Sequence, residues 1–99
     1  MGDINGALNA HKKAADINRK INDIKALDLN TWDIAVLYCD NGKYQQAIKY
    51  FKKDLELCKE LNNTKDIAST LSEIANIYLE QSDYQHAIDY FKRSLEQFE

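Results

Sequence analysis

Residues 42–57 read Gly-Lys-Tyr-Gln-Gln-Ala-Ile-Lys-Tyr-Phe-Lys-Lys-Asp-Leu-Glu-Leu, and residues 82–97 read Ser-Asp-Tyr-Gln-His-Ala-Ile-Asp-Tyr-Phe-Lys-Arg-Ser-Leu-Glu-Gln. The two stretches lie forty residues apart and are identical at nine of sixteen positions. A more diverged copy occupies residues 2–17 in the same frame. A fixed period in the range of ~20–50 residues is typical of a repeat array, in which each unit packs on its neighbours, rather than of a single globular core.

The composition agrees with one folded helical domain of 99 residues. Hydrophobic residues make up 44% and charged residues 29%, proline is absent and glycine occurs three times, so little interrupts long helices. The net charge of −3 argues against a general electrostatic attraction to nucleic acid. No apolar run reaches the ~18 residues of a membrane span, and no signal pattern opens the chain, so we expect a cytoplasmic protein that binds neither membranes nor nucleic acid.

Apolar residues at three- and four-residue spacing predict five helices. Their expected ranges are 3–22, 29–40, 43–61, 65–81 and 83–99, with a polar junction over 23–28. Asn41 and Gly42 predict a break, because both tolerate left-handed backbone angles. Ser82 and Gln85 resemble a capping box at the start of the last helix.

These residues resemble the tetratricopeptide repeat family, in a 40-residue form of the repeat. The positions that carry the resemblance are Ile34, Ala35, Tyr38, Tyr44, Ala47 and Phe51 in one copy, and Ile74, Ala75, Tyr78, Tyr84, Ala87 and Phe91 in the next. The resemblance implies an all-α, right-handed superhelix of antiparallel helix hairpins in the order B-A-B-A-B. The expected units are a partial repeat over 1–27 and repeats over 28–67 and 68–99. Asp54 and Ser94 depart from the family's usual alanine near the end of helix B.

The resemblance also implies a binding module whose concave face is lined by the A helices. The corresponding residues are Leu29, Trp32, Asp33, Val36 and Asp40 in the first A helix, and Ser69, Ser72, Glu73, Asn76, Leu79 and Glu80 in the second. Several family members use an asparagine at the Asn76 position to hold an extended peptide, and an amide can donate and accept at once. The acids on this face and the large Trp32 favour a protein or peptide partner with basic residues and an apolar anchor. The alternative is a solvated acidic face on which Trp32 packs locally.

A second hypothesis is self-association, because the last helix carries an apolar series without a polar helix expected to cover it. The series consists of Tyr84, Ile88, Tyr90, Phe91, Leu95 and Phe98. End-to-end or swapped dimers would bury these side chains.

Catalysis, cofactors and metals are not expected. His11 is in phase with Phe51 and is interpreted as an aromatic substitute in the packing, whereas His86 is expected on a solvated surface. Cys39 and Cys58 lie on different predicted helices and are interpreted as reduced, packed thiols. No Cys–His pair has metal-ligand spacing and no glycine-rich phosphate loop is present.

Overall fold

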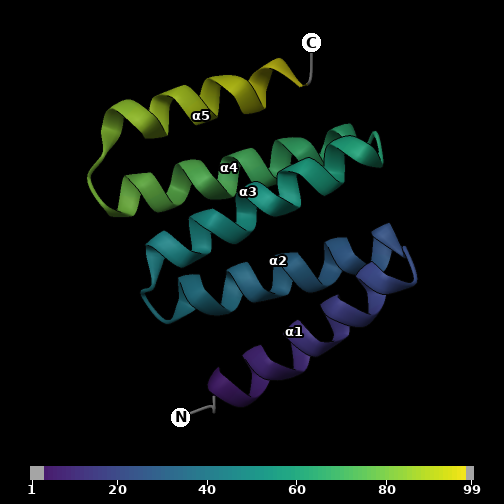
Figure 1. Cartoon of the computed structure of the whole chain (residues 1–99). Helices are drawn as coiled ribbons and strands as arrows, with labels where there is room; N and C mark the ends of the chain where they lie inside the picture. Colours follow the sequence, from purple (N-terminus) through teal and green to yellow (C-terminus); the bar gives the residue numbers. More distant parts are fainter. Residues whose placement is uncertain (1–3, 98–99) are drawn as a thin grey trace.

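The computed structural model describes residues 4–97, which form five α-helices joined by short turns (Figure 1). Their bounds are α1 Ile4–Lys20, α2 Ile24–Asp40, α3 Tyr44–Glu60, α4 Thr64–Glu80 and α5 Tyr84–Glu96. From α1 to α5 the helices follow one another across the molecule, and each packs against the helices before and after it in the chain. The expected all-α architecture is confirmed.

Four equivalent turns separate the helices at intervals of twenty residues. The residues with positive φ are Asn22, Gly42, Asn62 and Ser82. In the second turn the Gly42 amide donates to the carbonyl of Cys39 at 3.0 Å, and the Lys43 amide donates to that of Tyr38 at 2.9 Å. This is the Schellman arrangement, in which two otherwise unpaired carbonyls at a helix end gain donors. Each of the other three turns has the same pair of hydrogen bonds, so each helix ends at a fixed place.

The residue that closes one helix also caps the next. Asp23 accepts from the amide of Ala26, and the side chains of Asn63 and Asp83 accept in the same way at the starts of α4 and α5. Such a cap supplies an acceptor for an amide that has no partner within the helix. Lys43 occupies the equivalent position before α3 and makes no side-chain cap.

One expectation about a helix start was wrong. Helix α2 begins at Ile24 rather than near Leu29, because the Asp23 cap allows residues 24–28 to join the helix and Leu27 to be buried. The expected repeat boundaries after residues 27 and 67 therefore fall inside α2 and α4, so they divide the chain by repeat register and not at loops.

The capping box at Ser82 is also absent. Ser82 has a φ of 61° and precedes the cap, whose acceptor is the carboxylate of Asp83. In α1, Leu8 and Ala15 are buried, whereas Ile17 is exposed although its spacing is typical of the apolar side.

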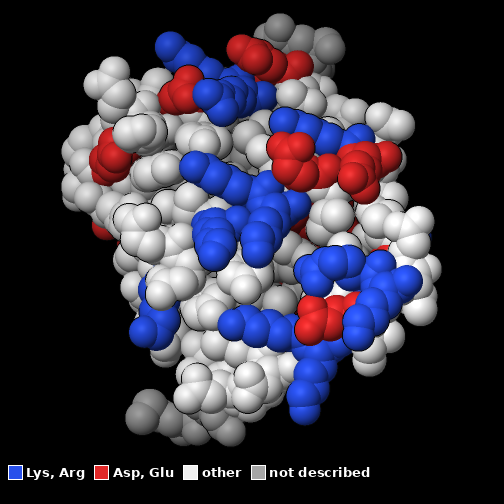
Figure 2. Space-filling model, in the orientation of Figure 1, with Lys and Arg blue, Asp and Glu red and all other residues white. Residues whose placement is uncertain are grey.

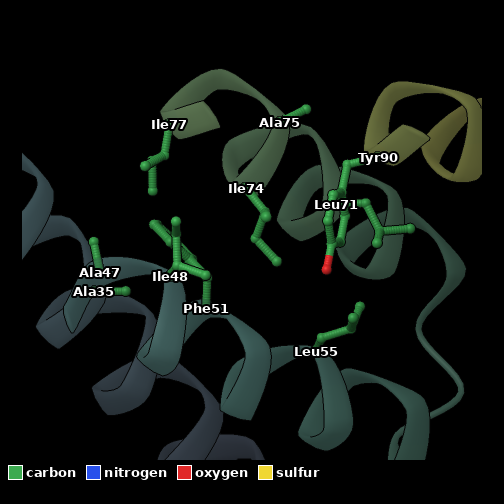
Figure 3. Close-up of a cluster of buried hydrophobic side chains, with 10 residues drawn as sticks. All are labelled: Ala35, Ala47, Ile48, Phe51, Leu55, Leu71, Ile74, Ala75, Ile77 and Tyr90. Carbon is green, nitrogen blue, oxygen red and sulfur yellow. The ribbon is translucent and has the colours of Figure 1, made fainter. Parts of the chain in front are cut away.

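Small side chains allow the helices to approach closely. Ala35, Ala47, Ala75 and Ala87 are fully buried, and Figure 3 shows Ala35 beside Ala47 at the contact between α2 and α3. Larger side chains then fill the space between successive hairpins. Phe51 is among the largest fully buried side chains, and a phenylalanine of this kind contributes about 3–5 kcal/mol relative to alanine.

The uncapped start of α3 yields a first prediction. We expect Lys43→Asp to raise the free energy of unfolding by about 1 kcal/mol, because aspartate supplies the missing acceptor and its charge interacts favourably with the helix dipole. Urea unfolding measures this difference. Lys43→Ala is the control that removes the positive charge without adding an acceptor; equal stabilisation by alanine would contradict the capping explanation.

Candidate functional site

The A helices α2 and α4 bring acidic side chains to the surroundings of Cys39. Burial raises the pKa of the Cys39 thiol, and the negative charges of Asp40, Glu73 and Glu80 raise it further. Asp40 belongs to α2, whereas Glu73 and Glu80 belong to α4. All three acids therefore lie close enough to raise the pKa of one half-buried thiol, and this part of the two A helices is negatively charged.

The other residues expected to line this face differ in exposure and in the side chains that they contact. Leu29, Asn76 and Leu79 are exposed. The Asp33 carboxylate lies 3.9 Å from Nδ1 of His11 on α1.

Two further residues of the expected lining take part in packing. The Ser72 hydroxyl lies 2.9 Å from the Ser94 hydroxyl on α5, so it helps to join α4 to α5. Val36 packs partly buried against the core.

Trp32 is half-buried: its side chain contacts the core and also borders a cavity. Its ring meets the ring of Phe51 edge-on, with centroids 5.0 Å apart, a geometry favoured by aromatic quadrupoles. The same side chain also lines a cavity between α2, α3 and α4. Trp32 therefore packs locally, as the alternative interpretation expected, and still borders an open space.

We call this cavity the Asp54 pocket. Its volume is about 240 Å³, and its lining is Asp28, Leu29, Trp32, Asp54, Cys58, Asp66, Ser69 and Thr70. Leu29, Trp32 and Ser69 belong to the face predicted from the sequence, whereas the other five residues do not. The missed residues come from the N-terminal turns of α2 and α4 and from the last half of α3.

Inside the pocket is a buried polar cluster. Asp54 and Cys58 each expose 1% of their surface. The Cys58 thiol lies 3.5 Å from Oδ1 of Asp28 and 3.7 Å from Oδ2 of Asp54. The Thr70 hydroxyl lies 3.0 Å from the same Asp54 oxygen and 2.8 Å from the carbonyl of Asp66, but it has only one hydrogen to share between them.

The other oxygen of Asp54 has no hydrogen-bond partner among residues 4–97. Burial raises the pKa of Asp54 to about 8, and the neighbouring Asp28 contributes further. The Cys58 pKa is also raised, chiefly by burial and then by the charge of Asp54. Near neutral pH Asp54 therefore carries a proton for most of the time, and Cys58 is a neutral thiol.

Asp28, Asp54 and Cys58 also form a set of potential metal ligands, which the sequence reading did not expect. One ligand atom from each lies within 4.8 Å of the others. The signal that could have found this cluster was Asp54 itself, because it stands where the family has alanine. Asp28 and Thr70 gave no comparable signal, since their proximity to Asp54 depends on the packing of three helices.

The basic side chains of the B helices are held by tyrosines and acids. Lys12 donates to the Tyr38 hydroxyl at 3.0 Å, which raises the Lys12 pKa, and the Lys53 ammonium lies 4.7 Å from the centroid of Tyr50. Figure 2 shows Lys and Arg gathered over the middle and lower part of one face, with Asp and Glu among them. This interleaving is typical of a solvated helical surface.

The histidines and cysteines occupy ordinary structural positions. His86 is exposed, its Nδ1 lies 2.8 Å from the Asp83 carboxylate, and its ring stacks on Tyr78. His11 is half-buried rather than part of the core. Cys39 and Cys58 are free thiols on different helices, as expected. Across residues 4–97 no helix is both long and apolar enough to cross a membrane.

The stacked helix pairs, their buried alanines and the shared turns define a helical-hairpin repeat protein. The sequence model of the tetratricopeptide repeat matches residues 27–99, and the chain belongs to this family. The N-terminal domain of stress-induced protein-1 (STI-1) from C. elegans is similar in structure, with a TM-score of 0.68 and 21% sequence identity over 99% of this chain and 89% of that chain. No curated protein sequence gives a significant match.

The raised pKa of Asp54 makes stability depend on pH. An aspartate in the unfolded chain has a pKa of about 3.9, so the folded state binds the proton more tightly. The stability from this group is fully present below about pH 4 and is lost as the pH rises to about 8, with a slope of up to about 1.4 kcal/mol per pH unit.

Urea unfolding of the wild type and Asp54→Asn across this range isolates the contribution, because asparagine has nearly the same shape and does not titrate. We expect the wild type to lose stability relative to the variant as the pH rises. Parallel curves for the two proteins would contradict the raised pKa.

Proposed function

We propose that this chain is a protein-interaction module that binds a polypeptide partner along the face formed by α2 and α4 and performs no chemistry itself. Membership of the tetratricopeptide repeat family supports the general class. The observation that carries the choice of face is the shared negative field of Asp40, Glu73 and Glu80 from the two A helices. The expected absence of cofactors and the expected cytoplasmic location stay predictions.

The chemistry of this face favours a partner with basic and apolar residues. Its acids attract positive charge, and complementary charge raises association rates and excludes acidic competitors. Exposed Leu79 and half-buried Trp32, on the same two helices, offer apolar contacts. The exposed Asn76 amide can donate to and accept from the backbone of an extended peptide.

Selection from a random peptide library against the immobilised chain tests this proposal. We expect enriched peptides to contain lysine or arginine together with an aromatic or aliphatic residue. The double charge reversal Asp33→Lys and Glu73→Lys should weaken their binding by about tenfold or more, equivalent to ~1.4 kcal/mol.

The matched control is Glu56→Lys with Asp89→Lys, which changes the net charge equally at exposed positions of the B helices. Equal loss in both variants would indicate attraction to net charge alone. Unchanged binding after reversal at Asp33 and Glu73 would reject the proposed face.

Self-association through α5 is a second candidate function. The outward side of α5 exposes Tyr84, Ile88 and Leu95 by 61%, 54% and 64%, and Phe91 between them is half-buried. These residues follow the i, i+4, i+7, i+11 spacing of one helix face. A contiguous apolar stripe of this kind is typical of an interaction surface. Phe98, the last residue of the expected series, lies outside the described residues.

Light scattering over a dilution series tests this candidate. If α5 pairs with a second copy, the mass should rise towards that of a dimer with concentration, and Ile88→Glu should weaken the association by at least about tenfold. Gln85→Glu adds the same charge three residues away and serves as the control. A monomer at every concentration would exclude this second candidate.

A further inference from the structure

We propose that the Asp54 pocket receives the cationic end of a lysine or arginine side chain from the bound polypeptide. This inference deepens the proposed function and rests on it. It assigns one position of the partner to one site, which adjoins the A-helix face and shares Leu29, Trp32 and Ser69 with it. Three lines of observation support it: the unpaired oxygen of Asp54, the apolar walls and the charge of the lining.

Asp54, one of the residues that line the pocket, has a carboxyl oxygen without a hydrogen-bond donor among residues 4–97. Asp54 is almost completely buried, and its Oδ1 atom has no partner among the described residues. An unsatisfied buried oxygen is costly, and the cost is removed when a donor reaches it. An ammonium or guanidinium group brings both a hydrogen and a positive charge, which makes the hydrogen bond stronger than one from a neutral donor.

The walls suit the aliphatic part of a long basic side chain. Leu29 is exposed, and the Trp32 side chain is half-buried, with its ring already fixed by Phe51. Lysine and arginine bury their methylene groups against such surfaces while the charged end reaches a polar group. The aromatic ring adds a favourable site for a cation. A volume of about 240 Å³ has room for a side chain or several waters, more than one bare ion requires.

The lining is acidic and contains no lysine, arginine or histidine. The groups that face Asp54 are Asp28 on α2, Cys58 on α3, and Thr70 and Asp66 on α4. Asp66 already accepts a hydrogen bond from the Asn63 side chain. Asp28 and Asp54 are thus two neighbouring carboxyl groups with which an arriving cation would interact favourably.

The site occurs in one repeat only. At the positions forty residues after Asp28 and Asp54 stand Ala68 and Ser94. The Ser94 hydroxyl donates to the carbonyl of Ala68 at 2.9 Å. At the equivalent place in the second hairpin, the two polar groups therefore satisfy each other's hydrogen bonding. Asp54→Ser therefore introduces a residue that this fold already accommodates in the same register, and it is the natural test variant.

The test uses small probes and NMR titration of the whole chain, observing the Trp32 indole and the Thr70 amide. The probes are the N-acetyl methylamides of lysine, arginine and norleucine. We expect saturable shifts with lysine or arginine, and a loss of binding by at least about tenfold in Asp54→Ser. Norleucine has the same length as lysine without its charge and should give no saturable shift.

Other outcomes would overturn the proposal. Equal binding of norleucine and lysine would identify an apolar pocket, and saturation by zinc chloride with a shift of the Cys58 β-carbon, but none by lysine, would identify a metal site. Peptides selected by the α2–α4 face that bind Asp54→Ser as tightly as wild type would overturn the pocket and leave the proposed function intact. Saturation by the lysine probe without any selected peptide would support the pocket and overturn the peptide-binding face.

Discussion

A left-handed residue followed at once by a helix cap occurs between every pair of successive helices, and the rest of the structure depends on this constraint. The left-handed residue satisfies the carbonyls at one helix end, and the next residue begins the following helix. Helices α2, α3 and α4, each of which lies between two such turns, are consequently all 17 residues long. Equal lengths and identical turns place Ala35 opposite Ala47 and Ala75 opposite Ala87, where close approach is possible. Alanine is required there by geometry, since a larger side chain would separate the pair.

The same register brings Asp28, Asp54 and Thr70 from three helices to one point. A buried carboxyl at this contact between hairpins is unfavourable for stability, because the group is desolvated and incompletely hydrogen-bonded. Ser94 shows that a small hydroxyl can occupy the equivalent contact with its hydrogen bonds satisfied. A residue less favourable than the available alternative is typical of positions where binding rather than folding determines the side chain.

The sequence was sufficient for the architecture because its signals are local and repeated. The forty-residue period and the alanine and phenylalanine positions of the repeat could be recognised from the sequence, and Ala35, Ala47, Phe51, Ala75 and Ala87 are all buried. The start of α2 was missed because Asp23 and Asp28 were both interpreted as polar loop residues. One caps the helix and the other is buried within it. The distinction depends on Leu27 finding a place in the core, which no local propensity encodes.

The Asp54 pocket could not be predicted from the sequence for a related reason. Asp54 was noticed as a departure from alanine, but its partners are 26 residues before it and 16 residues after it in the chain. Their meeting depends on the relative rotation of α2, α3 and α4. Similarly, the Ser72 hydroxyl was expected on an open face, and only the position of α5 shows that it is engaged.

The packing of each helix mainly on its neighbours in the chain also affects how the protein folds and unfolds. Each helix mainly contacts those directly before and after it, so most native contacts join residues close together in the chain. Such a topology has a low contact order, and little loop-closure entropy opposes each step of assembly. The free-energy surface is then close to that of a one-dimensional chain of coupled units, in which order spreads from any hairpin and the ends open before the middle. Asp54, with its contacts to α2 and α4, belongs to that middle, which opens last.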